Sequence, residues 1–224
     1  MAASSSERAR ARYQDVAVAD GYDSWRYETA RGRRRNRRDL AAIAHALDEA
    51  SRRGWPIGSA LDLPCGTGRL VPLLRKRGIA AVAADISLEM MRVARQKLGA
   101  TLPLLQCDAD AIPYRDASVD CVFAIRFMFH LDREGRRRIL MEMRRVSRRW
   151  LVVDFRHRYN FRYIGWRIRH ELGLLARVQF RFSRRILREE LAEAGLRLAG
   201  IYPSRRYLGW LSDKWTVLAE KSGP

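Results

Sequence analysis

Apolar and polar residues follow two periods along the chain and predict strands and helices in regular succession. Leu40, Ile43, Leu47 and Ala50 recur at helical spacing and predict an amphipathic helix over about 37–51. Short apolar runs predict strands at about 59–63, 79–85, 102–106, 119–125, 150–154, 196–202 and 214–220. Because helical patterns lie between most of these strands, the chain is expected to form a mainly parallel sheet covered by helices on both faces.

Local signals refine this picture. Ser87, Asp132 and Ser183 stand where three helices begin, and Ser and Asp are favoured N-caps. Pro103 lies in the predicted strand 102–106 and favours an edge position, because proline has no N–H to donate to a central ladder. Residues 146–150 are expected to form a surface turn before the fifth strand.

We interpret residues 1–224 as one domain with two additions. Residues 1–51 are expected to be a helical extension that acts as a lid. Residues 155–182 are dense in arginine and aromatic side chains and break the rhythm of strands and helices, which favours an inserted segment that caps a substrate.

The composition is that of a globular protein, with 47% hydrophobic residues. No apolar run reaches the length of a membrane span, and the N-terminus has no apolar core of a secretion signal. Cys65, Cys107 and Cys121 form no closely spaced pair and are expected to be buried and reduced, which favours a cytoplasmic location.

The net charge of +19, from 44 basic and 25 acidic residues, favours a polyanionic partner such as RNA, DNA or an anionic membrane surface. Most of the basic residues are arginine, and alanine is also abundant. Because a GC-rich coding bias gives the same composition, the charge alone does not select a partner.

Candidate chemistry gathers where three consecutive predicted strands end. Asp62 and the turn Pro64-Cys65-Gly66-Thr67-Gly68 follow the first strand. Asp85 ends the second strand, and Asp108 follows the third. Ligands of open α/β sheets bind at the carboxyl ends of the strands, where a carboxylate binds a ribose. The chain lacks the Gly-x-Gly-x-x-Gly pattern suited to a pyrophosphate, which disfavours a dehydrogenase.

These segments resemble the class I S-adenosylmethionine-dependent methyltransferases, in particular the small-molecule branch that includes quinone-biosynthesis enzymes. The resemblance rests on four segments in order, at 61–69, 84–90, 107–113 and 119–124. It implies a Rossmann-like, doubly wound α/β sheet of seven strands with an antiparallel last strand. It also implies S-adenosylmethionine as the cofactor.

The resemblance implies a role for each residue of the turn and of the strand ends. Asp62 and the turn with Pro64, Gly66 and Gly68 would hold the methionine end of the cofactor. Asp85 would bind the ribose hydroxyls. The remaining contacts would fall on the adenine and its surroundings, from Ile86, Met90, Asp108, the N–H of Ala109, and Ile125. Pro64 departs from the family pattern, which has glycine there.

The acceptor side is less well defined by the sequence. His130 is the candidate general base, and Arg126 is a candidate to orient an acidic group. Tyr22 and Arg26 resemble the lid element of this branch. Packing roles explain these four residues about as well. The sequence shows no catalytic triad and no metal-ligand spacing.

The sequence therefore predicts methyl transfer to a small-molecule or lipid-like acceptor by in-line displacement. Two alternatives stay open. The acceptor could be RNA, because of the basic charge, or the chain could bind the cofactor without activity and act through partners.

Overall fold

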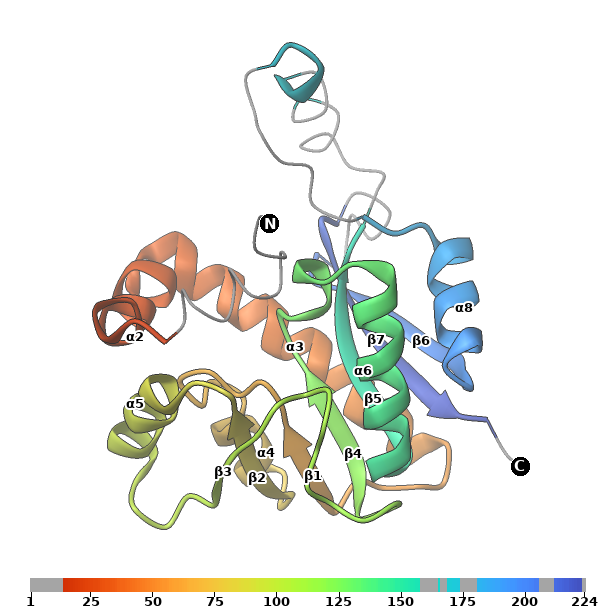
Figure 1. The fold of residues 1–224 in the computed structure, drawn as a ribbon, viewed down its shortest axis with the longest axis horizontal. Coiled ribbons are helices and arrows are strands. Elements are labelled where there is room, and N and C mark those ends of the chain that lie inside the picture. The colour runs from red at the N-terminus through yellow and green to blue at the C-terminus, as the bar shows by residue number, and fades with distance from the viewer. Residues whose placement is uncertain (1–13, 158–164, 166–168, 174–180, 206–211, 223–224) are drawn as a thin grey trace.

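The computed structural model describes residues 14–157, 165, 169–173, 181–205 and 212–222. These residues form a seven-stranded sheet in the order β3-β2-β1-β4-β5-β7-β6 (Figure 1). The strands are β1 (Ser59–Asp62), β2 (Ala80–Asp85), β3 (Leu104–Gln106), β4 (Val119–Ala124), β5 (Ser147–Arg156), β6 (Leu196–Pro203) and β7 (Lys214–Lys221). β7 is antiparallel to β5 and β6, whereas β1 to β5 are parallel to their neighbours. The predicted fold class is confirmed.

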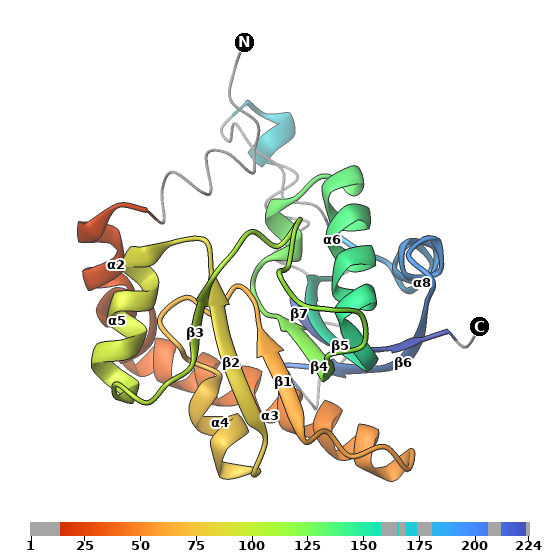
Figure 2. The ribbon, with the colours of Figure 1, turned by 60° about the horizontal axis from the view of Figure 1, so that its bottom comes forward.

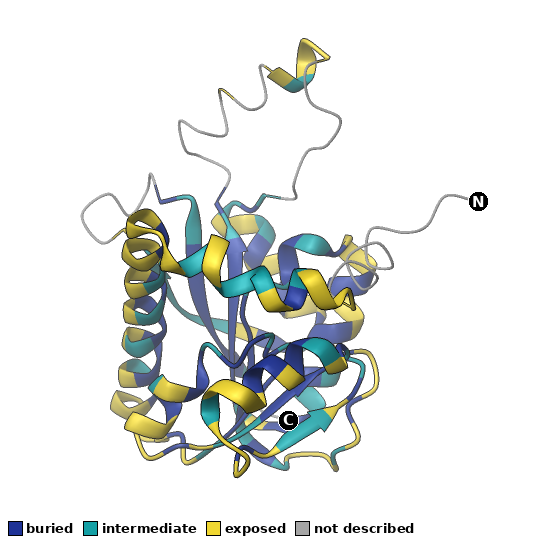
Figure 3. Cartoon of the chain, turned by 90° about the vertical axis from the view of Figure 1, so that its left-hand side faces the viewer, coloured by how far each residue is buried: buried dark blue, intermediate teal, exposed yellow. Residues whose placement is uncertain are grey.

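Helices cover both faces of the sheet (Figure 2). α6 (Arg133–Val146) and α8 (Arg184–Glu193) pack on one face. α3 (Ala30–Arg52), α4 (Val71–Lys76) and α5 (Leu88–Leu98) pack on the other. Figure 3 shows buried residues along the strands and exposed residues on the outer sides of the helices.

A helical segment precedes α3, and a short helical turn follows β4. α2 (Val16–Asp23) leads through a π-helical turn, η1 (Ser24–Glu28), into α3. A 3₁₀ turn, η2 (Met128–His130), follows β4. The predicted N-caps are confirmed, because Ser87, Asp132 and Ser183 each accept a hydrogen bond from a backbone N–H in the first turn of the helix that follows.

Two of the predicted boundaries are wrong. The helix expected from 37 begins at Ala30, because Thr29 caps it by accepting from the N–H of Gly32, and the arginine run forms its first turns. The surface turn expected at 146–150 is instead the start of β5, with Ser147 fully buried. The periodicity of α6 runs directly into that strand, so no separate turn is needed.

The proline prediction is confirmed. β3 lies at the edge of the sheet, and Pro103 immediately precedes it. The carbonyl of Pro103 accepts from the N–H of Ala83, so this residue joins β2 through its oxygen just before β3 begins at Leu104.

Candidate active site

A cavity of about 440 Å³ lies at the carboxyl ends of β1, β2 and β4. Ten of the residues singled out in the sequence line it: Tyr22, Asp62, Pro64, Gly66, Asp85, Ile86, Met90, Ile125, Arg126 and His130. We call residues 62–69 and 85–90, which follow β1 and β2, the floor of the cavity. We call the residues that α2 and η1 contribute the cover, and residues 125–132 the side wall.

Asp85 ties the floor together. Its side chain is only 5% exposed, and its two oxygens accept hydrogen bonds from the N–H groups of Gly66 (2.8 Å) and Ser87 (2.9 Å). Burial raises the pKa of this carboxyl, and the backbone N–H groups oppose the shift. An ionised carboxylate has about four acceptor positions, so Asp85 retains capacity for a ligand's hydroxyl groups.

Asp62 differs from Asp85 in having an unsatisfied oxygen. It is 2% exposed, and its Oδ2 has no hydrogen-bond partner among the described residues. Burial raises the pKa of Asp62 to about 7, with a further contribution from the charge of Asp85. A buried acceptor without a partner is costly unless a ligand completes it. The cavity wall at Asp62 therefore suits a cationic or donor group of a ligand.

The two glycines of the turn have different tasks. Both adopt positive φ, +55° at Gly66 and +74° at Gly68. A Cβ at Gly66 would have no atom within 4 Å, whereas a Cβ at Gly68 would collide with Leu98 Cδ1 and would lie 3.2 Å from Ala94 Cβ. Gly66 thus leaves room in the cavity, and Gly68 allows the turn to pack against α5; Gly68 itself does not line the cavity.

Pro64 is accommodated in the turn. It follows Leu63 through a cis peptide bond and lines the cavity. The neighbouring N–H of Cys65 donates to the carbonyl of Ala84 at 2.7 Å, which fixes the turn to β2. The departure from glycine at this position therefore leaves the turn joined to the sheet.

The loop after β3 reaches the cavity at a different residue from the one predicted. Asp108 and Ala109 do not line the cavity, but Asp110 does. Asp108 accepts from the N–H of Asp110 at 3.1 Å and so shapes this loop. Sequence reasoning missed Asp110, although it lies within the same Cys-Asp-Ala-Asp segment.

The cover is attached to the floor and to α5. Thr67 in the turn donates its hydroxyl to Asp23 at 2.8 Å, and Lys97 of α5 forms an ion pair with the same aspartate. Tyr22 and Tyr27 line the cavity and meet edge to face, with ring centroids 6.0 Å apart. Burial raises the pKa of Tyr27 far above its usual range, so the phenol stays neutral at physiological pH.

Arg26 does not reach the cavity. Its guanidinium lies over the ring of Trp25, 5.1 Å from the centroid, and its carbonyl accepts from Arg35. Tyr27, one residue on, takes the place in the cavity that the sequence assigned to Arg26. The π-helical turn shifts the phase of the side chains, which periodicity could not indicate.

Within the side wall, Arg126 has an unusual backbone conformation. Its φ is +68°, rare for a residue with a side chain, and its N–H donates to Asp154 at 2.6 Å. Lys214 holds Asp154 at 2.5 Å and also contacts Asp39 of α3 at 3.0 Å. This buried network places Arg126 in the cavity, where its Nε is buried without a hydrogen-bond partner among the described residues.

His130 ends the 3₁₀ turn of the side wall and lines the cavity. Its ring packs against Phe129, with centroids 4.5 Å apart. Further side chains that the sequence did not single out also line the cavity, namely Tyr27, Arg69, Asp110, Phe127, Leu131 and Arg138. Most of them are neighbours of residues that the sequence did single out.

The described residues contain no cluster of potential metal ligands and no helix long and apolar enough to cross a membrane. Cys65, Cys107 and Cys121 are free and buried. Most of the cap segment predicted at 155–182 lies outside the described residues, including Phe161, Tyr163 and Phe180.

Residues 60–149 match the model of a methyltransferase domain family. Ubiquinone/menaquinone biosynthesis C-methyltransferases UbiE from Burkholderia mallei and Burkholderia thailandensis are 36% identical to this chain over 112 residues. These matches cover 45% of the chain and 44% of each relative, so the chain spans less than half the length of the relatives it matches.

Solved structures resemble the fold over nearly the whole chain. Magnesium protoporphyrin IX methyltransferase from Synechocystis, with bound S-adenosylhomocysteine, has a TM-score of 0.71 at 16% identity and covers 97% of this chain and 100% of its own. The 1,6-didemethyltoxoflavin-N1-methyltransferase of Burkholderia thailandensis has a TM-score of 0.65 at 18% identity, and the match covers 100% of this chain and 92% of that enzyme. At these identities the likeness concerns the fold. The domain match over residues 60–149, the strand order and the residues at the strand ends agree, and they make this chain similar to the S-adenosylmethionine-dependent methyltransferases of this fold.

Proposed function

We propose that the chain binds S-adenosylmethionine in this cavity and transfers its methyl group to a small-molecule or lipid-like acceptor. The observation that carries the proposal is the unsatisfied Oδ2 of Asp62 beside the open position at Gly66. A buried carboxylate and a side-chain-free turn suit the cationic, narrow methionine end of this cofactor. The solved Synechocystis enzyme holds S-adenosylmethionine or S-adenosylhomocysteine on the same fold.

The floor supplies the other cofactor contacts in this proposal. Asp85 accepts from the ribose hydroxyls with the acceptor positions that Gly66 and Ser87 leave open. Ile86, Met90 and Ile125 line the cavity and are the apolar contacts that we propose for the adenine. We propose that Asp110, which lines the cavity, meets the adenine edge; the direct contacts predicted for Asp108 and Ala109 stay predictions.

When bound, S-adenosylmethionine supplies a methyl group on a sulfonium, whose departure as a neutral thioether needs no proton. The chain's task is therefore to hold the acceptor in line and to keep water away. Correct positioning alone can contribute about 7–11 kcal/mol to such a displacement. Tyr22 and Tyr27 cover the floor, and the apolar side chains of Phe127 and Leu131 line the acceptor side.

His130 is the proposed proton acceptor where the attacked atom is a hydroxyl or a protonated amine. It lines the cavity together with Arg126, which we propose to orient the acceptor. The relatives and neighbours above are named for ubiquinone/menaquinone biosynthesis, magnesium protoporphyrin IX and 1,6-didemethyltoxoflavin, so a small acceptor fits this proposal.

The remaining parts of the proposal concern organisation and location. We propose one methyltransferase domain over 1–224, with a lid at 1–51 and an acceptor cap at 155–182. α2 and η1 support the lid, because they bring Tyr22 and Tyr27 to the cavity. The three free, buried cysteines support a reducing compartment such as the cytoplasm.

The direct test is to incubate the full chain and S-adenosylmethionine carrying a labelled methyl group with a small-molecule extract of the native cells. The proposal expects label in one low-molecular-weight product that is absent with the D62N/D85N double variant. Cofactor binding without any labelled product, across extracts and RNA fractions, would instead leave the alternative of an inactive cofactor-binding protein. Label recovered in RNA would contradict the small-molecule acceptor.

A further inference from the structure

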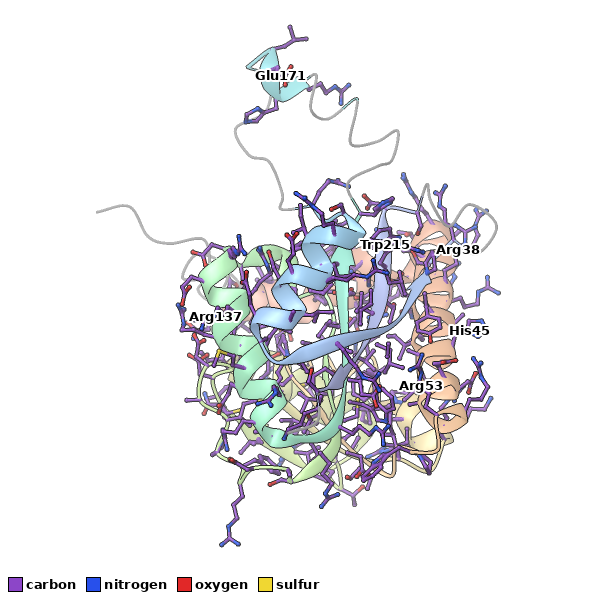
Figure 4. All side chains as sticks on the ribbon, turned by 90° about the vertical axis from the view of Figure 1, so that its right-hand side faces the viewer. Arg38, His45, Arg53, Arg137, Glu171 and Trp215 are labelled. Atoms are coloured by element: carbon purple, nitrogen blue, oxygen red, sulfur yellow. The ribbon has the colours of Figure 1, made fainter. Side chains whose placement is uncertain are left out.

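The first turns of α3 carry an arginine patch that the methyltransfer proposal does not use. The patch consists of six exposed residues: Arg31, Arg33, Arg34, Arg35, Arg37 and Arg38. Among the described residues none of the six forms an ion pair; Arg33 and Arg35 donate only to the backbone carbonyls of Glu28 and Arg26. Figure 4 shows Arg38 and His45 on α3. The patch therefore faces outward with its charge uncompensated.

This placement works against the stability of the helix. The N-terminal end of a helix carries partial positive charge, so cations there are unfavourable, and α3 has no acidic residue in its first turn. Within the patch, Arg35 is also disfavoured as a cation: burial and then the charge of nearby Arg26 lower its pKa. An arrangement that folding disfavours is explained if an anionic partner neutralises it.

An exposed aromatic residue accompanies the patch. Trp25, in the π-helical turn just before α3, is 50% exposed, and Val16 at the start of α2 is 51% exposed. Arg26 lies over the Trp25 ring at 5.1 Å, and Tyr22 meets the ring edge on at 5.6 Å. These neighbours leave little free ring face for stacking on a nucleobase, whereas a half-exposed indole beside arginines is typical of a membrane interface.

The helical segment that carries the patch also contacts a residue that lines the cavity. Asn36 of α3 accepts from Arg69, which lines the cavity, and the Arg69 guanidinium lies over Tyr27 of the cover at 5.4 Å. A surface that engages the start of α3 is therefore next to the residues that close the cavity. This suits an acceptor that is drawn from a lipid layer.

We propose that the arginine patch on α3 and Trp25 dock the protein on an anionic membrane surface, with the covered side of the cavity toward the lipid. Arginines near such a surface each raise the partition coefficient by about fivefold, and salt weakens the effect. The indole adds a contribution that salt does not screen. The docking does not depend on the methyltransfer proposal and is tested without it.

The test is co-sedimentation of the full chain with vesicles of phosphatidylcholine alone and of phosphatidylcholine with 30% phosphatidylglycerol. We expect binding only to the anionic vesicles, with a loss of at least about tenfold in R34Q/R37Q/R38Q. The matched control is R184Q/R185Q/R188Q, which removes the same charge from α8 on the opposite face of the sheet and is expected to bind like wild type. Glutamine preserves helix propensity, and the thermal unfolding midpoint checks the fold of each variant.

Two further measurements separate the membrane from RNA. W25A is expected to lose the binding to anionic vesicles that persists at 300 mM salt, while a 20-nucleotide oligouridylate binds weakly at that salt concentration. Wild-type binding by R34Q/R37Q/R38Q, or an equal loss in the α8 variant, would overturn the proposal. Tighter binding to the oligonucleotide than to anionic vesicles, unaffected by W25A, would assign the patch to RNA and overturn it as well.

Discussion

The floor and the cover of the cavity differ in how their functional groups are held. Backbone groups hold the floor: Asp85 is fixed by the N–H groups of Gly66 and Ser87, and Cys65 by the carbonyl of Ala84. Side chains hold the cover, through Thr67 to Asp23 and Lys97 to Asp23. A floor fixed by the sheet suits the cofactor, which is the same in every turnover. A cover joined by side chains suits the acceptor, which has to enter and leave.

The largest effect is expected from Asp62, the floor residue left unsatisfied. Its pKa is raised from 3.8 to about 7, so the folded protein favours the protonated form of this carboxyl. The free energy of unfolding therefore falls progressively as the pH rises from about 4 to 7. D62N removes that cost. The apo variant is expected to be more stable than wild type at pH 8, by up to about 4 kcal/mol, with no gain below pH 4.

The same substitution separates stability from binding. Denaturant unfolding at pH 4 and pH 8 measures the stability, and calorimetry with S-adenosylhomocysteine measures the binding. Wild-type affinity is expected to fall below pH 7, where Asp62 takes up a proton, and D62N is expected to bind weakly at every pH. A variant that binds as well as wild type would remove Asp62 from the cofactor site.

The next largest effect is expected from the two glycines of the floor. G68A places a methyl group against Leu98 and Ala94 at a positive φ and is expected to cost about 2–3 kcal/mol of stability. G66A meets open space and is expected to cost about 1 kcal/mol but to weaken cofactor binding at least tenfold. Thermal unfolding and calorimetry on both variants check this crossed pattern; parallel losses would contradict it.

His130, in the side wall, is expected to affect catalysis but not cofactor binding. H130Q is expected to lower kcat by about 10²-fold or more for an acceptor that must lose a proton, since general bases contribute that much. Cofactor affinity is expected to stay the same. A kcat that is unchanged at every pH would reduce His130 to a packing residue.

The smallest effect is expected from the attachment of the cover. D23N weakens the bond from Thr67 and the ion pair with Lys97, a loss of about 1 kcal/mol. Because the cover only closes over a floor that is already formed, affinity is expected to fall a few-fold. Calorimetry measures the change, and D48N, which loses the exposed ion pair with Arg77, is the matched control.

The same contrast separates what the sequence predicts from what it does not. The floor consists of strand ends and a glycine turn, features with local sequence signals, and Asp62, Gly66 and Asp85 could be identified from their spacing. The network that places Arg126 joins residues 39, 154 and 214, which no periodicity connects. The π-helical turn shifts the cover by one residue, from Arg26 to Tyr27. Local patterns thus predict the floor, and distant contacts build the rest.

The central claim is that the floor binds S-adenosylmethionine through Asp85. Titration calorimetry of S-adenosylhomocysteine against wild type, D85N and the surface control D116N tests it most directly. The account predicts one site in wild type and D116N, and a loss of about 100-fold in D85N, because charge-assisted hydrogen bonds to a ribose disappear. No binding by folded wild-type protein, or undiminished binding by D85N, would contradict it.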